Sequence, residues 1–289
     1  MKNVKILIAF HGEKPPVEAP EYLSIHVGSE ESQGVLRDDE GENISAKNSV
    51  YNELTAIYWA WKNYQAVGDP EYIGLCHYRR YFVWEKRKYP YYECDTFEEV
   101  RNSSALCEEE VQARLSEAEV LAPMRTRRKS VRYNYVRAHH EDDLNLALSI
   151  VDAISPNLTQ YANEYLESKG AYFYNMFVLP KERFFAYASW LFAVLDSFEK
   201  STAHPTERMF ISEVLTGIYL YYLRKTAPSF GELPVLFVVG KKQKLGEAIR
   251  ETLTNFREKK AGFMYCLRPL LLWFIPRKLM LRRRQKRVK

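Results

Sequence analysis

The sequence has few cysteines and no long apolar run, and both absences narrow what it can encode. Only four of its 289 residues are cysteine, and none forms a CxxC pair. We therefore expect no disulfide framework and no structural zinc site, and free thiols suit a reducing cytoplasm. No uncharged apolar stretch reaches about 18 residues, so no ordinary membrane span is expected. The first apolar run, residues 6–10, is too short for a signal-peptide core.

The remaining composition is that of a folded globular protein. Hydrophobic residues make up 46% and charged residues 27%, which excludes collagen-like repeats and wholesale disorder. Aromatic residues are abundant, with 21 tyrosines, 15 phenylalanines and 5 tryptophans. Such rings line sites for sugars and planar ligands, and they also fill cores and their wet rims.

Positive charge is concentrated at the end of the sequence. Eight of the last 13 residues are Lys or Arg, while the whole chain carries a net charge of only +5. The body is therefore slightly acidic, and we expect no nucleic-acid partner. An apolar block over residues 263–275 precedes this basic tail. The combination is typical of a segment that lies on an anionic membrane surface, although a packed helix followed by a disordered tail is the alternative.

Short apolar runs alternate with amphipathic segments, which predicts an α/β fold. Between the second expected strand and the first expected helix, residues 28–49 form a long polar segment, and such segments are usually functional or mobile. The expected strands cover residues 4–10, 22–27, 72–76, 120–122, 172–179 and 233–239. The expected helices cover residues 50–66, 97–116, 142–154, 158–167, 184–198, 207–223 and 245–256.

The strand over residues 72–76 leads into the most informative cluster, His77, Arg79 and Arg80. In open α/β sheets, ligands bind outside the carboxyl ends of the strands. Guanidinium groups offer planar forks of donors that suit a phosphate or diphosphate. The alternative interpretation is a salt-bridged strand end with a structural histidine.

Five further polar residues are candidates for a site. Asp38, Asp39 and the nearby Asn43 could hold ribose hydroxyls or a divalent ion, or could simply form turns. Asn175 lies within an aromatic strand and needs a hydrogen-bonding partner if it is buried. Glu213 can act as a general base if it lines a pocket, whereas an exposed helical glutamate is the alternative.

The pair His139 and His140 precedes an acidic helix start. Metal binding is one interpretation of this pair. Adjacent helical residues do not face each other, however, and the sequence contains no HExxH motif. An acidic first helical turn is the simpler explanation, so no metal site is expected here.

Several segments together resemble a known family. The motifs are NIS at residues 43–45, YNELTA at 51–56, YWAWKN at 58–63, YIGLCHYRRYF at 72–82, AHH at 138–140, DL at 143–144, YNMF at 174–177 and SE at 212–213. Their order and spacing, from about residue 4 to residue 239, resemble the bacterial family called domain of unknown function 4422. The resemblance implies a glycosyltransferase domain over residues 1–258, with a GT-A-like mixed sheet flanked by helices. Residues 259–289 would then be an apolar and basic membrane-associating tail.

The resemblance also implies substrates and a location. The donor would be a nucleotide sugar, namely a UDP-sugar, and the transferred group a hexose or galactofuranose. The acceptor would be a glycan on a polyprenyl diphosphate, in the synthesis of capsular polysaccharide, exopolysaccharide or O-antigen. The protein would then be cytoplasmic and peripheral, with residues 263–289 on the anionic inner face of the cell membrane. The competing class is a non-enzymatic polyanion- or glycan-binding protein with a basic tail.

The roles that the resemblance implies can be assigned residue by residue. His77, Arg79 and Arg80 would contact the donor diphosphate, and Asp38, Asp39 and Asn43 the nucleotide. Asn175, His139 and His140 would line the sugar or acceptor pocket, and Glu213 would be the base of an inverting reaction. Common GT-A enzymes place a DxD motif at a central strand end, where this sequence has His77-Tyr78-Arg79. We therefore expect no cofactor, although Mn²⁺ or Mg²⁺ held by Asp38 and Asp39 is the alternative.

Overall fold

The first apolar run, Val4–Phe10, forms the central strand β1 of a mixed sheet. The computed structural model describes residues 1–12, 15–28, 35–127, 129–204, 209–240, 249–250 and 252–253. Almost all of the helix expected over residues 245–256, and all of the tail at 259–289, lie outside these described residues. No helix in the described part of the chain combines the length and apolar character that crossing a bilayer requires.

The main sheet has the strand order β11-β7-β10-β4-β1-β2-β3. Strand β1 pairs in parallel with β2 and β4, whereas β10 runs antiparallel to both β4 and β7. Strand β5 extends β4 and joins β12 and β6 to the sheet. The bounds are Tyr22–His26 for β2, Leu36–Arg37 for β3, Tyr72–His77 for β4, Arg80–Phe82 for β5, Tyr91–Cys94 for β6, Val120–Pro123 for β7, Phe177–Pro180 for β10, Phe230–Leu233 for β11 and Val235–Val238 for β12. A separate small sheet pairs Thr126–Arg127 (β8) with Gly170–Ala171 (β9).

This strand arrangement brings distant segments to one edge of the sheet. The carboxyl ends of β1, β2 and β4 share that edge because these strands are parallel. The amino end of β10 lies at the same edge, since its first residue, Phe177, pairs with Leu75 near the end of β4. Residues just after β4 and just before β10 therefore meet there.

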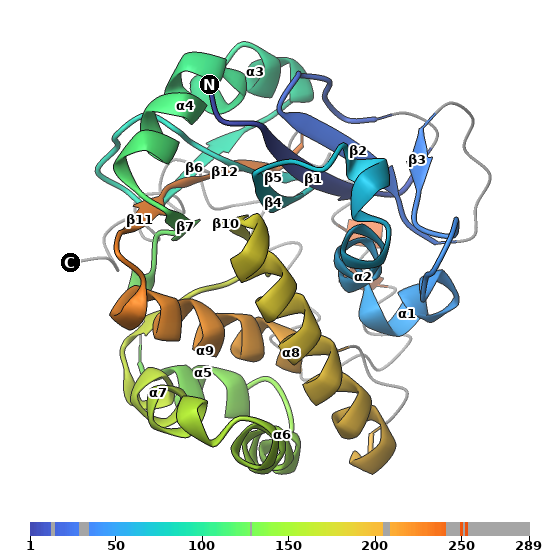
Figure 1. Ribbon diagram of the computed structural model, residues 1–289, viewed down its shortest axis with the longest axis vertical. Coiled ribbons are helices and arrows are strands. Elements are labelled where there is room, and N and C mark those ends of the chain that lie inside the picture. The colour runs from blue at the N-terminus through green and yellow to red at the C-terminus, as the bar shows by residue number, and fades with distance from the viewer. Residues whose placement is uncertain are drawn as a thin grey trace.

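Helices cover both faces of the sheet, and side chains alternate between them as strand geometry requires. Along β1, Leu7 and Ala9 pack into the core beneath α2, α8 and α9, while Ile6 and Ile8 join the core beneath α3 and α4. Figure 1 shows α3 and α4 on one side of the sheet and α8 and α9 on the other, with α5–α7 beyond α9. The expected mixed α/β sheet flanked by helices is confirmed.

The helices have the following bounds. They are Asn48–Tyr51 (α1), Leu54–Lys62 (α2), Phe97–Arg101 (α3), Glu108–Glu117 (α4), Val131–Val136 (α5), Glu141–Ile154 (α6), Pro156–Glu167 (α7), Lys181–Ser201 (α8) and Ile211–Thr226 (α9). Short 3-10 turns cover Ser45–Lys47, Tyr64–Val67 and Ser104–Leu106.

Three sequence-based element predictions are wrong in detail. The helix expected over residues 50–66 is interrupted at Asn52, whose φ of 51° lies in the left-handed region. The strand expected from residue 172 begins only at Phe177, because Tyr174 and Asn175 also have positive φ, 79° and 52°. Left-handed backbone cannot continue a helix or a strand ladder. The helix expected over residues 97–116 divides into α3 and α4.

Candidate functional site

A cleft of about 400 Å³ opens at the edge of the sheet where β1 and β4 end. Its polar lining comes from five segments that are far apart in the sequence. These supply His11 after β1, Asn52 and Glu53 between α1 and α2, His77, Arg79 and Arg80 around the end of β4, and Asn175, Ser212 and Glu213 before β10 and in α9. The structure therefore brings together five sequence-predicted residues, namely His77, Arg79, Arg80, Asn175 and Glu213.

The two arginines of the cleft rest on tyrosine rings. The guanidinium carbon of Arg79 lies 4.7 Å from the centre of the Tyr78 ring, and that of Arg80 lies 4.5 Å from the Tyr174 ring. No ion pair between described residues involves either arginine. Ring stacking fixes a guanidinium but leaves its in-plane N–H donors for another partner. Both groups can therefore bind an anion that enters the cleft.

His77, at the end of β4, contributes no positive charge to this cluster. Burial, together with the neighbouring charges of Arg80 and Arg79, lowers the pKa of His77 to about 3. The ring is therefore neutral at pH 7. Its Nδ1 has no hydrogen-bonding partner among the described residues, so the imidazole can still make a neutral hydrogen bond to a ligand.

Asn175 connects three parts of the cleft through hydrogen bonds. Its side-chain nitrogen donates to Glu53 Oε1 and to Ser212 Oγ, both at 3.0 Å. Its side-chain oxygen accepts from Thr216 Oγ1 at 2.8 Å, and Thr216 in turn contacts the Tyr187 hydroxyl at 2.7 Å. Asn175 is only 3% exposed, and this network gives it the partners that a buried amide requires. The network fixes Glu53 and the start of α9 relative to the strained turn before β10.

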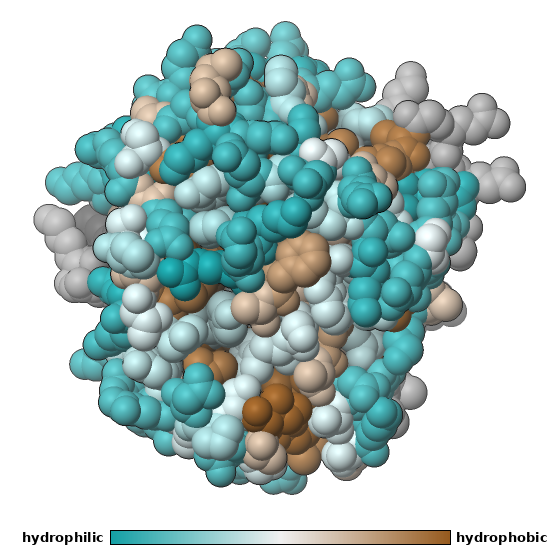
Figure 2. Space-filling model, viewed as in Figure 1, coloured by the Kyte–Doolittle hydropathy of each residue, from teal (hydrophilic) through white to brown (hydrophobic). Residues whose placement is uncertain are grey.

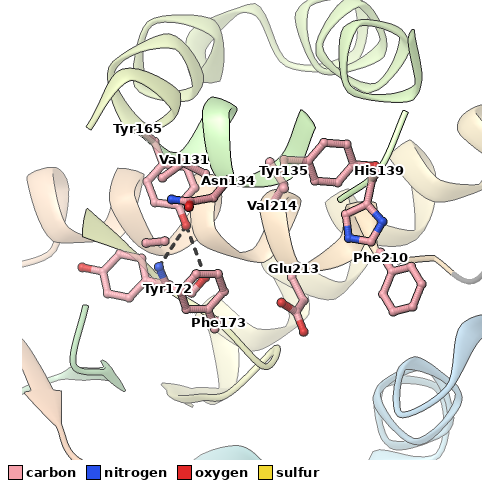
Figure 3. Close-up of a pocket in the computed structure, with 11 residues that line it drawn as sticks. Val131, Asn134, Tyr135, His139, Tyr165, Tyr172, Phe173, Phe210, Glu213 and Val214 are labelled. Atoms are coloured by element: carbon pink, nitrogen blue, oxygen red, sulfur yellow. Dashed lines mark hydrogen bonds between the residues drawn. The ribbon is translucent and has the colours of Figure 1, made fainter. Parts of the chain in front are cut away.

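Glu213 lies in the first turn of α9, half-buried between the cleft and a second cavity. Burial and the nearby Glu53 carboxylate raise its pKa to about 7, although the positive charge of Arg80 acts in the opposite direction. Figure 3 shows its carboxylate between Phe173 and Phe210. A carboxylate with this pKa can accept a proton near neutral pH.

The second cavity, which we call the recess, has a volume of about 90 Å³. It shares Phe210 and Glu213 with the cleft. The rest of its lining is Val131, Asn134, Tyr135, His139, Tyr165, Ala171, Tyr172, Phe173 and Val214. The recess is therefore predominantly aromatic.

The two adjacent histidines occupy different places. His139 lines the recess, and its ring stacks on Phe210 with 4.8 Å between centroids. His140 lines neither cavity; it stacks on His204 at 3.8 Å, and His204 lies 3.1 Å from an oxygen of Asp143. The structure thus places only His139 beside Glu213.

Asp38, Asp39 and Asn43 do not line the cleft. Asp38 is fully buried and accepts hydrogen bonds from Gly28 N at 3.1 Å and Ser45 Oγ at 2.5 Å. The guanidinium of Arg37 bonds Asp39 and lowers the pKa of that carboxyl group. Asn43 donates to the Asp39 and Gly41 carbonyls, both at 2.9 Å. These residues hold the loop that follows β3, and their contact with a nucleotide stays a prediction.

The sequence reasoning did not assign a role to Asn52 and Glu53, which the structure places in the cleft. A signal was present, because this polar pair interrupts the apolar helical stripe of residues 51–61. His11 and Phe210 were also missed. Nothing in their local sequence distinguishes them, since the topology alone brings them to the cleft.

Fold and site together indicate the class of protein: a mixed α/β protein with cations and carboxylates in a cleft at the carboxyl edge of its sheet. The chain belongs to the family described as Domain of unknown function (DUF4422), whose model matches residues 5–225. No curated protein sequence matches the chain.

A solved structure, the apo structure of WbbM, described as a bifunctional glycosyltransferase, is similar to this chain. The TM-score is 0.73 and the sequences are 27% identical, over 90% of this chain and 53% of that chain. This chain therefore spans about half the length of that enzyme. The sheet and its flanking helices are therefore similar to the fold of a glycosyltransferase, and this similarity supports a transferase role in general.

Proposed function

We propose that the chain is a glycosyltransferase that moves a hexose or galactofuranose from a UDP-sugar to a lipid-linked glycan. The observation that carries the proposal is the content of one cleft. It holds two arginines that form no ion pair with another described residue, together with a glutamate whose pKa is raised to about 7. The likeness to half of a bifunctional glycosyltransferase supports the same class of reaction.

The two halves of the cleft have complementary tasks in this reaction. The Glu213 carboxylate takes the proton of the acceptor hydroxyl, and the freed oxygen forms a bond to the anomeric carbon of the donor sugar. The bond from that carbon to the diphosphate oxygen breaks, and UDP leaves with the bonding electrons. Arg79 and Arg80 stabilise the negative charge that develops on the leaving diphosphate. Attack opposite the leaving group inverts the anomeric centre.

The proposal includes no metal ion. Asp38 and Asp39 were the alternative ligands, and neither lines the cleft. Asp38 Oδ1 accepts hydrogen bonds from Ser45 Oγ and Gly28 N, its buried Oδ2 has no hydrogen-bonding partner among the described residues, and the Arg37 guanidinium bonds Asp39. The described residues contain no group of three or more His, Cys, Asp or Glu side chains that could hold a metal ion. Neutralisation of the diphosphate by arginines is therefore the better-supported proposal.

The proposed acceptor is a glycan on a polyprenyl diphosphate, in polysaccharide synthesis at the inner face of the cell membrane. The resemblance of the sequence motifs supports it, as does the apolar and basic composition of residues 263–289. That segment would hold the protein on anionic lipid, next to a substrate that cannot leave the membrane.

The test is a transfer assay with the full chain. UDP-glucose, UDP-galactose and UDP-galactofuranose are each incubated with a lipid extract that contains polyprenyl-linked glycans. We expect one donor to release UDP while the glycolipid gains the mass of one sugar residue. The Glu213→Gln variant serves as the inactive control. If no donor releases UDP and no glycolipid gains mass, the proposed function is wrong.

A further inference from the structure

The recess beside Glu213 differs in chemistry from the cleft. Its walls are aromatic: Tyr135, His139 and Phe210 form a row with centroid separations of 4.9 Å and 4.8 Å, and Phe173 lies on the other side of Glu213. No lysine or arginine is among the described residues that line it. A phosphate group would find no cation there, so the recess does not suit a nucleotide.

Two polar groups in the recess can bind hydroxyls. The Asn134 side-chain nitrogen donates to the Lys129 and Ser130 carbonyls, at 2.8 Å and 3.0 Å, which uses both of its hydrogens. The Asn134 side-chain oxygen is thus left as an acceptor. Glu213 supplies the second acceptor at the boundary with the cleft. Flat apolar walls with a few hydrogen-bond acceptors match a sugar ring, which has an apolar C–H face and a rim of hydroxyls.

The size of the recess limits how much of a glycan it can take. A volume of about 90 Å³ is small beside the roughly 300–1,000 Å³ of a typical small-molecule pocket. The recess therefore takes one sugar ring at most and excludes a branched or extended oligosaccharide. The remainder of a longer glycan would have to lie outside the recess.

We propose that the recess is the acceptor subsite, where the terminal pyranose of the glycan stacks on the aromatic walls and directs one hydroxyl to Glu213. This inference rests on the proposed function and deepens it. The donor occupies the arginine-containing cleft and the acceptor the aromatic recess. Glu213, which lines both cavities, is the point where the two sugars meet.

The experiment compares two aromatic residues: Phe173, which follows strand β9, and Tyr133, which lies in helix α5. Phe173 lines the recess but not the cleft. Tyr133 is 42% exposed and lines neither cavity, so it provides the matched control. The variants are Phe173→Leu, which removes the ring but keeps an apolar side chain, Phe173→Ala, and Tyr133→Leu.

The probes are methyl and octyl β-galactopyranoside and β-glucopyranoside, titrated in the presence of UDP and followed by saturation-transfer NMR. We expect at least one hexoside to bind the wild type and Tyr133→Leu equally. Both Phe173 variants should bind it about five- to tenfold more weakly, as expected for loss of one aromatic contact. Their affinity for UDP should stay within about twofold of wild type, which also shows that they are folded.

Three results would overturn the inference. The first is that neither methyl nor octyl hexosides bind the wild type. The second is that Phe173→Leu binds them as tightly as wild type. The third is that tetraethylene glycol monooctyl ether, which has the alkyl chain but no sugar, displaces the octyl hexosides, since the recess would then bind the lipid.

The same variants separate this inference from the proposed function. If the binding of hexosides depends on Phe173 while no donor is turned over, the sugar subsite is supported and the proposed transfer reaction is contradicted. If transfer occurs and Phe173→Leu leaves the KM for the acceptor unchanged, the proposed reaction is supported and the proposed subsite is contradicted.

Discussion

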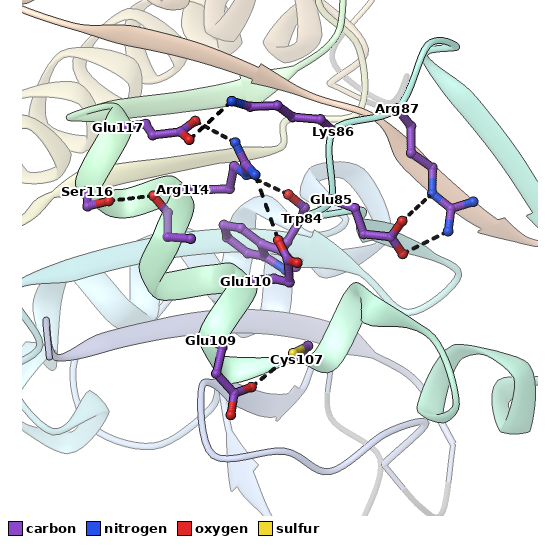
Figure 4. A network of polar contacts seen from close by, with 11 residues as sticks. Trp84, Glu85, Lys86, Arg87, Cys107, Glu109, Glu110, Arg114, Ser116 and Glu117 are labelled. Atoms are coloured by element: carbon purple, nitrogen blue, oxygen red, sulfur yellow. Dashed lines mark hydrogen bonds and ion pairs between the residues drawn. The ribbon is translucent and has the colours of Figure 1, made fainter.

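Two charged hollows on this molecule use arginine in opposite ways. One is the cleft; the other is a groove of about 300 Å³ along β7 and β11, lined in part by Arg87, Arg114, Glu117 and Glu232. Figure 4 shows that acids surround the arginines of the groove. Arg87 donates to both oxygens of Glu85, at 3.1 Å and 2.8 Å, and Arg114 bonds the Trp84 carbonyl at 2.7 Å and Glu117 at 2.5 Å.

The cleft lacks this internal pairing. Arg79 and Arg80 lie on tyrosine rings, and Glu213, an acid of the same cleft, has a pKa raised to about 7. Figure 2 shows a surface on which hydrophilic residues predominate, so a charged hollow alone is not distinctive. What distinguishes the cleft is that its two arginines form no ion pair among the described residues and that left-handed residues, Asn52 and Asn175, line it. Unpaired charge and backbone strain are retained where a ligand or a reaction makes use of them.

The largest expected effect is on turnover. Glu213→Gln removes the proton acceptor and should lower kcat by about 10²- to 10⁴-fold. The Kd for UDP should change little, because the arginines that bind the diphosphate are intact. Single-turnover kinetics and UDP titration measure the two quantities separately. Near-normal turnover in this variant would remove Glu213 from the mechanism.

The comparison of the two hollows predicts a second, smaller effect on donor affinity. Arg80→Ala should weaken UDP binding by about 10- to 100-fold, because a charge-assisted hydrogen bond to the diphosphate is lost. Arg87→Ala should leave the Kd unchanged, since Arg87 pairs with Glu85 in the groove. Calorimetric titration of UDP into both variants makes the measurement. An equal loss of UDP affinity in the two variants would show that the different pairing of arginines in the cleft and the groove does not determine UDP binding.

The pH dependence of kcat/KM should show the ionisation of Glu213 in the free enzyme. A base must be deprotonated, so with a pKa of about 7 kcat/KM should rise about tenfold from pH 6 to pH 8. The folded pKa lies above the value of about 4.5 expected in the unfolded chain, so folding favours the protonated form. Stability should therefore fall as pH rises from about 4.5 to 7, and Glu213→Gln should raise the Tm at pH 8.

Arg80 provides a check on this assignment. Its positive charge lowers the pKa of Glu213, so Arg80→Ala should shift the rising limb of the kcat/KM profile to higher pH. A flat wild-type profile between pH 6 and pH 8 would contradict the role of Glu213 as the base. If the pH profile of Arg80→Ala coincides with that of the wild type, the electrostatic interaction between Arg80 and Glu213 is contradicted.

The smallest expected effect concerns stability. Asn175→Ala leaves Ser212 and Thr216 without their partner and should cost about 1–3 kcal/mol. Asn175→Gly removes the same side chain but suits a φ of 52°, so it should be less destabilising than Ala. Urea unfolding of both variants measures the difference. Equal stability of the two variants would mean that the backbone at this position is not strained.

Regular elements of the fold were predictable because their apolar periodicity is strong. Strand β1 has the predicted bounds, and helices α6 and α7 each begin within two residues of their predicted first residue. The break at Asn175 was not predictable, because tertiary contacts fix it, whereas the side-chain hydrogen bonds at Asn52 are local ones to residues 48–55. The hydrogen bond from Asn175 to Glu53 joins positions 122 residues apart, and no local pattern encodes it.

The candidate site was predictable where strand topology decides the position. His77, Arg79 and Arg80 follow a buried strand, and Glu213 begins an amphipathic helix, so both clusters were candidates from sequence. Composition could not separate a ligand-binding acid from one that builds a loop. Asp38 is an example: its hydrogen bonds hold Gly28 and Ser45, and its contact with a nucleotide stays a prediction.

The central claim is that the unpaired arginines of the cleft bind the donor diphosphate without a metal ion. The most direct measurement is the Tm of the full chain with UDP, in EDTA and in manganese, for wild type and for the Arg79→Ala/Arg80→Ala double variant. A ligand that binds the native state raises the Tm. We predict a rise with UDP that persists in EDTA and disappears in the double variant. A rise that needs manganese, or one that the double variant retains, would contradict the claim.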